Sequence, residues 1–289
     1  PVLLVPGYCM NTTPLGYHPE GPSLIEFLAV RGFEVWTSNL RAQAASRPIG
    51  GPLNVGFREI ALGDLPCAID HVRAHTRALE DRVDVVGCSL GGTYLFVYLA
   101  HHPRDHGVGS IVTMGAPLRW DGAHPILRMA FVSTTFAGWL PSAGTRRAME
   151  LIMPFVAERA PSMLSMYLNA STVDLSCARK LVETVEDPIP RLNGEIARWF
   201  KARDLTVDGV NVTRAFREID RPLLCIVANR DGIVPTAAAR SALDASGSSD
   251  RELLAVGDDE IWFAHADLFI SRHAQDKVFD PLARWLAAR

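Results

Sequence analysis

The stretch that decides the fold is Val83-Asp84-Val85-Val86-Gly87-Cys88-Ser89-Leu90-Gly91-Gly92, which an apolar run from Thr93 to Ala100 follows. It predicts a buried strand, a sharp turn that carries Ser89, and a helix directly after the turn. A serine in the pattern Gly-x-Ser-x-Gly is held at such a turn in a strained conformation, with its hydroxyl projecting outward. Gly-rich loops also match this pattern by chance, and the flanking strand and helix are what favour a nucleophile.

The glycines of this turn have a steric purpose. Gly87 and Gly91 lack Cβ atoms, so the strand and the helix can approach each other closely around Ser89. The helix begins at the reactive oxygen and directs its free backbone N–H groups there.

The overall composition excludes several classes of protein. The 289 residues are 48% hydrophobic, enough for one large domain or for a core with an insertion. A net charge of −3 gives no basic surface, so nucleic acid is not an expected partner. The five cysteines have no C-x-x-C spacing, so we expect neither a disulfide framework nor a metal site.

No apolar run is long enough for a transmembrane helix, so we expect none. The cysteine usage favours a reducing, cytoplasmic location. Because the chain begins at Pro1 rather than at Met, in what reads as a core strand, a secretion signal before it stays open.

Apolar runs alternate with helical patterns toward both ends of the chain. The expected strands are residues 2–5, 33–37, 82–86, 110–114, 222–228 and 252–256, and the expected helices include 23–30, 57–76 and 278–287. Most of these strands are continuously apolar, which is typical of a parallel sheet covered on both faces. The sequence therefore predicts an α/β fold with a mostly parallel, doubly wound sheet, in which reactive groups lie beyond the carboxyl ends of strands.

The alternation stops between Pro117 and about Leu205, where helix formers and large apolar side chains dominate. Five of the seven methionines fall in this segment, namely Met129, Met149, Met153, Met163 and Met166. We expect a helical cap over the strand ends, with core parts at residues 1–116 and 206–289 and the cap at 117–205.

The cap is also the expected wall of a substrate site, because methionine adapts to irregular apolar shapes. The expected substrate-binding residues are Trp139, Met129, Met149 and Met153. Packing of the cap helices against each other and the sheet would use many of the same side chains.

Two further residues beyond strand ends would complete a site with Ser89. A serine hydroxyl needs a base, which a histidine oriented by a buried carboxylate supplies. Asp231 follows the strand at 222–228, and His265 follows the last strand, which gives the order Ser, Asp, His known for this type of sheet. We therefore expect Ser89 as nucleophile, His265 as base and Asp231 as acid.

The alternatives for these roles are weaker. Asp121 follows the strand at 110–114 and is the main rival acid, and Asp267 either orients the His265 loop or lies on the surface. The other carboxylates considered lie in a charged loop, at Asp258, Asp259 and Glu260. The other histidines considered are His273, His101 and His102, and the helical pair His71 and His75, which has no third ligand in register.

The oxyanion that forms on attack needs two backbone donors. One is the N–H of Leu90, directly after the nucleophile, and the other comes from the loop Pro6-Gly7-Tyr8-Cys9. Tyr8 is the expected second donor, with Cys9 as the alternative. Cys88 occupies a variable position of the motif and is not expected to react.

Together these residues resemble the α/β-hydrolase superfamily of the serine esterase and lipase type, from Val2 to about Met114 and again from Pro222 onward. The C-terminal stretch His265-Ala266-Asp267-Leu268, with Val278 to Leu286, is similar to the branch around acid lipases and polyhydroxyalkanoate synthases. Those synthases use a Cys nucleophile, so Ser89 in its place favours hydrolysis.

Three positions depart from the family pattern. Pro6-Gly7 replaces His-Gly, Ala264 replaces the Gly before the histidine, and Ala42-Gln43-Ala44-Ala45-Ser46 replaces a Gly-rich loop. None removes a reacting group, but the first leaves the second oxyanion donor open.

The resemblance implies a serine hydrolase, without cofactor, that cleaves a hydrophobic carboxylic ester or lipid through an acyl-enzyme. Acyl transfer or thioester hydrolysis with the same triad is an alternative, and a non-catalytic ligand-binding protein on the same fold is another. A dehalogenase or epoxide hydrolase would carry Asp at position 89 and is disfavoured. Acyl length, alcohol and oligomeric state are left open.

Overall fold

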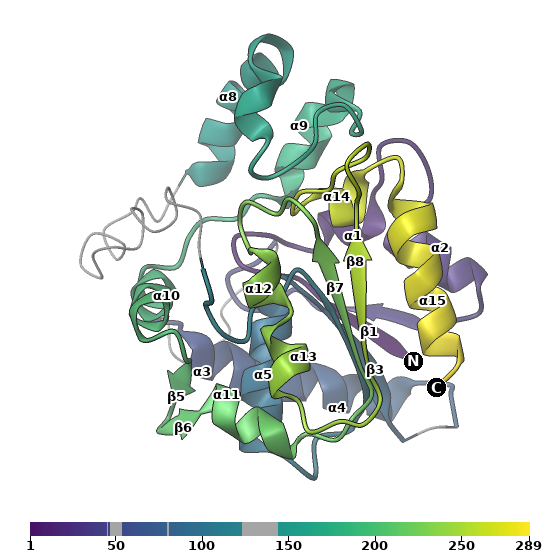
Figure 1. Cartoon of the computed structure of the whole chain (residues 1–289), viewed down its shortest axis with the longest axis vertical. Coiled ribbons are helices and arrows are strands. Elements are labelled where there is room, and N and C mark those ends of the chain that lie inside the picture. The colour runs from purple at the N-terminus through teal and green to yellow at the C-terminus, as the bar shows by residue number, and fades with distance from the viewer. Residues whose placement is uncertain (45, 47–53, 80, 123–143) are drawn as a thin grey trace.

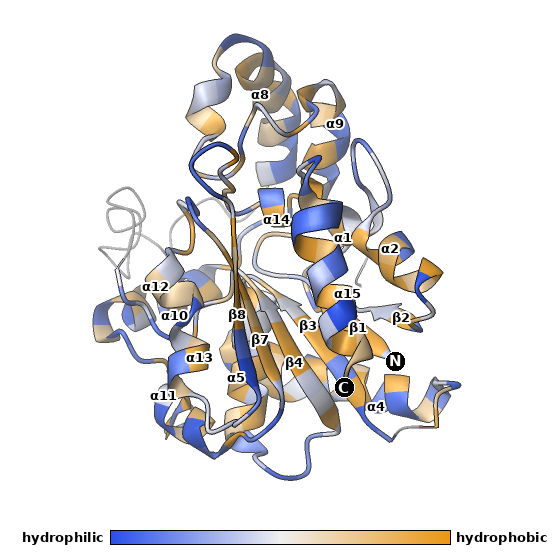
Figure 2. Ribbon diagram, turned by 45° about the vertical axis from the view of Figure 1, so that its right-hand side comes forward, coloured by the Kyte–Doolittle hydropathy of each residue, from blue (hydrophilic) through white to orange (hydrophobic). Residues whose placement is uncertain are grey.

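A central six-stranded sheet organises the molecule in the computed structural model, which describes residues 1–44, 46, 54–79, 81–122 and 144–289. The strand order is β2-β1-β3-β4-β7-β8, and every neighbouring pair is parallel (Figure 1 and Figure 2). The strands are β1 (Val2–Val5), β2 (Val35–Thr37), β3 (Val83–Cys88), β4 (Val108–Met114), β7 (Leu223–Ala228) and β8 (Arg251–Val256). The predicted α/β fold with a parallel, doubly wound sheet is confirmed.

The sheet is buried on both faces because its strands are apolar at successive positions. In β1, Leu3 and Val5 belong to one hydrophobic core, whereas Val2 and Leu4 belong to a second core on the opposite face. Coloured by hydropathy, the central strands are mostly apolar while the helices also carry polar residues (Figure 2).

Helices cover the two faces unequally. The core that includes Leu3 is closed by α4 (Leu65–His75), α5 (Leu90–His101), α10 (Pro190–Ala202), α11 (Val212–Ala215), α12 (Thr236–Ala239) and α13 (Ser241–Ala245). The opposite core is closed by α1 (Thr13–Gly16), α2 (Leu24–Val30), α14 (Asp267–Ile270) and α15 (Asp280–Ala287). Ser23 caps α2 in a capping box with Glu26, as its position before the apolar run predicts.

Prolines interrupt two of the expected helices, and Pro66 is where the sequence predicts a kink or break within residues 57–76. Residues 57–76 form α3 (Phe57–Glu59), a π-helical turn (Ile60–Asp64) and then α4, in which Pro66 lies in the first turn. The C-terminal helix repeats this arrangement, with a π-helical turn (Gln275–Phe279) before Pro281 of α15. Since proline has no N–H to donate, the hydrogen-bond register changes just before it.

The segment after β4 contains α8 (Thr145–Arg159) and α9 (Ala178–Leu181), which lie beyond the ends toward which β7 and β8 point (Figure 1). In contrast, α10 packs beside the sheet. There the ring of Trp199 packs edge-on against the ring of Phe57, with 5.7 Å between the ring centroids. An antiparallel pair, β5 (Thr206–Val207) and β6 (Val210–Asn211), follows it. Residues 123–143, with Met129 and Trp139, lie outside the described residues, and the division into core and cap stays a prediction.

The described residues contain no helix with both the length and the apolar character that crossing a membrane requires.

Candidate active site

Ser89 lies at the sharp turn between β3 and α5. Its backbone has φ 51° and ψ −128°, a strained conformation for a residue with a side chain. The turn is so tight that a Cβ on Gly87 would lie 2.4 Å from Gly92 Cα, and one on Gly91 would lie 2.3 Å from Val5 O. These two glycines are therefore required for the close approach that the sequence predicts.

His265 and Asp231 meet at the same end of the sheet. The His265 Nδ1 atom lies 2.6 Å from Asp231 Oδ2, and both side chains are buried. The other carboxylate oxygen, Oδ1, accepts from the backbone N–H groups of Ile233 and Val234, at 2.8 Å each. A carboxylate only accepts, so the proton lies on Nδ1 and the lone pair of Nε2 is free to take up a proton.

The end of β4 connects this pair to Ser89. Ser89 N donates to Met114 O at 2.9 Å. The next residue, Gly115, has φ +61°, and a Cβ there would lie 3.1 Å from His265 Cε1 and 3.3 Å from Asp231 Oδ2. The three predicted residues therefore follow β3, β7 and β8 at one edge of the sheet, with the end of β4 between Ser89 and Asp231. The structure brings His265 and Asp231 into direct contact.

Asp267, whose role the sequence leaves undecided, is fully buried beneath the His265 loop. Its Oδ2 accepts from Ala264 N at 2.6 Å and from Asn169 N at 2.9 Å. Asn169 Nδ2 in turn donates to Trp262 O at 2.9 Å. Asp267 thus links the loop that carries His265 to the segment after α8. Burial raises the pKa of Asp267 to about 6, against the effect of its two backbone donors.

This raised pKa predicts a pH-dependent contribution to stability. The pKa of Asp267 lies above its ordinary value of 3.8, so the folded state favours the protonated form. That contribution is complete below about pH 4 and is lost as the pH rises through about 6. We expect Asp267→Asn, which stays neutral, to gain stability relative to the wild type over this range, on the order of 1–3 kcal/mol.

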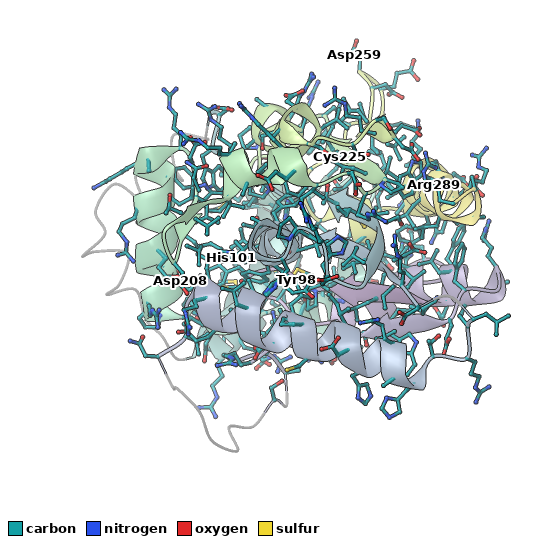
Figure 3. The ribbon with its side chains drawn as sticks, turned by 90° about the horizontal axis from the view of Figure 1, so that it is seen from below. Tyr98, His101, Asp208, Cys225, Asp259 and Arg289 are labelled. Atoms are coloured by element: carbon teal, nitrogen blue, oxygen red, sulfur yellow. The ribbon has the colours of Figure 1, made fainter. Side chains whose placement is uncertain are left out.

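Urea denaturation at several pH values measures this difference. Asp259→Asn is the matched control, because Asp259 is exposed at the rim of the molecule (Figure 3) and its removal should give no such trend. A difference between Asp267→Asn and the wild type that stays constant from pH 4 to about pH 7 would contradict the assignment.

The predicted oxyanion loop lies against the Ser89 turn. A Cβ on Gly7 would lie 2.8 Å from Ser89 Cβ and 3.2 Å from Leu90 N. The Tyr8 hydroxyl donates to Asn193 Oδ1 of α10 and accepts from Ile189 N. The loop that carries Tyr8 and Cys9 is therefore adjacent to Leu90, as the sequence leads us to expect.

The thiols near Ser89 are poor nucleophiles. Burial raises the pKa of Cys9 to about 12 and also raises that of Cys88. Both thiols stay protonated at neutral pH, whereas the reactive form of cysteine is the thiolate. Neither thiol therefore competes with the Ser89 hydroxyl for the role of the predicted nucleophile.

An apolar cavity of about 200 Å³ opens beside His265. Its wall combines α1, α8 and α14 with the segment after α9, through side chains that include Met149, Met153, Tyr167, Leu181, Val185 and Phe269. Met149 and Met153 are two of the four substrate-binding residues that the sequence predicts. The other two, Met129 and Trp139, lie outside the described residues.

The rival carboxylates face other partners. Asp121 pairs with Arg119 at 3.2 Å, and Asp258 pairs with Lys277 at 3.3 Å. Asp259 and Glu260 are exposed.

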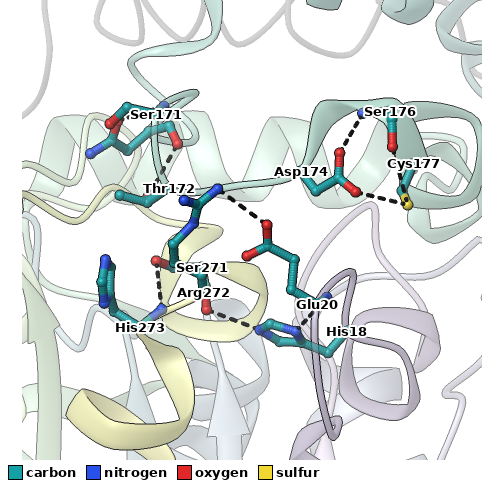
Figure 4. A network of polar contacts seen from close by, with 11 residues as sticks. His18, Glu20, Ser171, Thr172, Asp174, Ser176, Cys177, Ser271, Arg272 and His273 are labelled. Carbon is teal, nitrogen blue, oxygen red and sulfur yellow. Dashed lines mark hydrogen bonds and ion pairs between the residues drawn. The ribbon is translucent and has the colours of Figure 1, made fainter.

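The remaining histidines have structural contacts. His101, in the last turn of α5 (Figure 3), contacts Val97 O and Val207 O through its two ring nitrogens. The rings of His71 and His75 stack on each other, with 4.1 Å between their centroids. Among the described residues, no group of histidine, cysteine and carboxylate side chains fits a metal ion. His273 lies beyond α14 in a polar network (Figure 4), where Ser271 Oγ accepts from its backbone N–H.

The family described as alpha/beta hydrolase fold matches residues 1–177. No curated protein matches the sequence. A monoacylglycerol lipase from Paleococcus ferrophilus superposes with a TM-score of 0.62 at 17% identity, over 99% of this chain and 93% of that one.

Two other solved structures are similar. A soluble variant of monoglyceride lipase from Saccharomyces cerevisiae, in complex with a substrate analog, gives a TM-score of 0.65 at 16% identity, over 99% of this chain and 85% of that one. A putative aryl esterase from Burkholderia cenocepacia gives a TM-score of 0.61 at 15% identity, over 100% of this chain and 90% of that one. At this level of identity the likeness shows the fold.

Proposed function

The chain belongs to the alpha/beta hydrolase fold family, and we propose that it is a serine hydrolase that cleaves hydrophobic carboxylic esters. The observation that carries this proposal is the buried contact between His265 and Asp231, beside the strained Ser89 turn. Strain at a turn and a buried histidine–carboxylate pair each cost stability, and both are what an activated serine needs.

In the proposed reaction, His265 Nε2 takes the proton of Ser89 Oγ as this oxygen attacks the ester carbonyl carbon. Asp231 stabilises the imidazolium that forms and holds the ring in its orientation. The oxyanion accepts from the N–H groups of Leu90 and Tyr8. Collapse of the tetrahedral intermediate expels the alcohol, which takes its proton from His265.

Water completes the cycle in the same site. His265 deprotonates a water molecule, whose oxygen attacks the acyl carbon of the Ser89 ester. The second tetrahedral intermediate collapses to the carboxylic acid and returns the proton to Ser89 Oγ.

The apolar cavity beside His265 supports a hydrophobic acyl group as part of the substrate. His265 lies in its wall, so a chain held there places its carbonyl near the base. Met149 and Met153 of α8 contribute to the cavity, which supports a cap over the site in this part of the segment 117–205, whereas α10 packs beside the sheet. Exclusion of water by such a cap strengthens the oxyanion contacts.

Covalent labelling tests the proposed function directly. A fluorophosphonate should react with the protein, and peptide mapping should place the phosphonyl group on Ser89. The labelled protein should then have lost hydrolysis of 4-nitrophenyl esters. A protein that binds ligands on this fold without catalysis resists the reagent, and that outcome would overturn the proposal.

Product analysis distinguishes hydrolysis from acyl transfer. The acyl-enzyme is common to both, so the ester is incubated with an alcohol, an amine or a thiol, and acid is measured against transfer product. We expect the free acid to dominate.

Chain-length preference tests the acyl cavity. We expect Met153→Ala to lower kcat/KM for long-chain 4-nitrophenyl esters by about tenfold, because burial of a Met side chain contributes roughly 1.5–3 kcal/mol. Activity on the acetate ester should change little, since a short acyl group does not reach this wall. Met163→Ala is the control, because Met163 is 72% exposed. A chain-length profile that Met153→Ala leaves unchanged would refute this role.

A further inference from the structure

Gly7 lies between two neighbours at the end of β1. In the sheet β1 lies between β2 and β3, so the chain after β2 flanks Gly7 on one side and the Ser89 turn flanks it on the other. On the β3 side, the Gly7 α-carbon abuts Ser89, since an added Cβ would lie 2.8 Å from Ser89 Cβ. From the chain after β2, Gln43 Nε2 donates to Gly7 O at 2.9 Å.

The Gln43 amide is fixed at both of its polar ends. Its side chain is buried, with 7% of the residue exposed. Its Oε1 accepts from Leu40 N at 2.7 Å, which leaves the NH₂ group for Gly7 O. The amide cannot be turned over without losing both hydrogen bonds, so the donor presented to the Gly7 carbonyl is set by the fold.

The backbone around Gln43 is strained. Ala42 and Ala44 have φ of 62° and 47°, in the left-handed region that residues other than glycine rarely adopt. Ala44 N donates to Glu186 Oε1 at 2.9 Å, which holds the loop in this form. Strain of this kind persists where the surroundings over-determine it, and it concentrates at functional sites.

A trans peptide is planar, so its C=O and N–H groups point in opposite directions. The Gly7 carbonyl points to Gln43, and the N–H of Tyr8, in the same peptide, therefore points away from Gln43. The side opposite Gln43 is where β3 ends in Ser89 and where Leu90 N lies. The orientation of this one peptide decides whether Tyr8 N–H faces the oxyanion.

We propose, on the basis of the function proposed above, that Gln43 is a positioning residue of the oxyanion hole. By binding the Gly7 carbonyl, it aims the Tyr8 N–H at the oxygen that becomes negative beside Ser89. The Tyr8 ring is held independently through its hydroxyl, which contacts Asn193 and Ile189. Gln43 selects Tyr8 rather than Cys9 as the second donor, and it performs this role in the segment that departs from the Gly-rich family pattern.

Gln43→Met tests the proposal, because it keeps the length of the side chain and removes both the NH₂ group and the carbonyl oxygen of the amide. Loss of an oxyanion donor costs about 10²–10³-fold in kcat, so a donor that is only misaimed should cost about 10–100-fold. We expect this fall in kcat with KM nearly unchanged. A trifluoromethyl ketone, whose carbonyl takes up Ser89 Oγ to give an oxyanion, should bind more weakly by a similar factor.

Ser46→Ala is the matched control in the same loop. Ser46 Oγ donates to Asn39 O at 3.3 Å rather than to Gly7 O. We expect wild-type kcat and inhibitor binding from this variant. Equal losses of kcat in Gln43→Met and Ser46→Ala would make the role of Gln43 merely structural and overturn the proposal.

Gln43→Glu adds a readout that does not depend on how well Gln43→Met folds. The introduced carboxyl group, when protonated, can donate to Gly7 O and accept from Leu40 N, whereas the ionised carboxylate repels the Gly7 carbonyl. We expect the kcat of Gln43→Glu, divided by the wild-type kcat at each pH, to be highest at low pH and to fall as the pH rises. A ratio independent of pH would overturn the proposal.

The outcomes separate this proposal from the proposed function. If the wild type neither hydrolyses esters nor is labelled at Ser89, the proposed function fails. If the wild type is active and Gln43→Met, folded, has the same kcat and inhibitor affinity, only the role of Gln43 fails.

Discussion

Replacement of Ser89 by Ala is expected to lower kcat for ester hydrolysis by about 10⁴–10⁶-fold, since no acyl-enzyme can form without the hydroxyl. The fold should survive, because Ala tolerates a φ of 51° no worse than Ser does, and both carry the same strain there. The measurement is single-turnover and steady-state kinetics on 4-nitrophenyl esters, with thermal unfolding to confirm the folded state.

Cys88→Ala provides the control for this experiment. Its thiol is next to Ser89 in sequence but is buried in the opposite core, and burial raises its pKa. We expect kcat of this variant to stay near the wild-type value. Near-normal turnover by a folded Ser89→Ala variant would contradict the proposed mechanism, and loss of kcat in Cys88→Ala alone would move the nucleophile to the thiol.

The parts of the fold that the sequence predicts well are those that local rules determine. Continuous apolar runs predict buried parallel strands, and β3 and β7 lie close to where those runs place them. The turn at Ser89 needs glycine on both sides for steric reasons, which can be deduced from the motif alone. The rule that reactive groups lie beyond strand ends predicts that Asp231 and His265 meet, as they do.

Contacts between distant segments are what the sequence leaves undecided. The burial of Asp267 depends on Asn169, which is 98 residues away. The contact between Gln43 and Gly7 depends on the neighbouring positions of β1 and β2. The sequence places residues 190–202 within the expected cap, and nothing in it indicates that Trp199 packs against Phe57 beside the sheet. A pattern of apolar or polar residues indicates that a side chain is buried or hydrogen-bonded, but it does not identify the residue that the side chain contacts.

Asp231→Asn is expected to lower kcat by about 10⁴-fold while leaving the site folded. The Asn side-chain oxygen can still accept from Ile233 N and Val234 N, so the turn keeps its hydrogen bonds. Its NH₂ group then faces His265 Nδ1, which becomes the acceptor and forces the proton onto Nε2. In this tautomer the ring cannot take the proton of Ser89.

Asp121→Asn decides whether Asp231 or Asp121 is the acid of the triad. Asp121 follows β4, as the sequence analysis notes, but it pairs with Arg119 at 3.2 Å and is partly exposed. We expect kcat of Asp121→Asn within about twofold of the wild type, since surface ion pairs contribute little. If Asp231→Asn kept nearly full activity while Asp121→Asn lost it, the assigned acid would be wrong.

Combination with the other variants tests whether the three residues act as one unit. We expect His265→Ala to lower kcat about as strongly as Ser89→Ala, because an unactivated hydroxyl attacks esters poorly at neutral pH. Adding His265→Ala or Asp231→Asn to Ser89→Ala should then cause almost no further loss, since a base has no purpose without its nucleophile. Activity that remains in Ser89→Ala and falls by another large factor in the double variant would show that His265 activates water or another group directly. Ser89 would then lie beside the reaction without taking part in it.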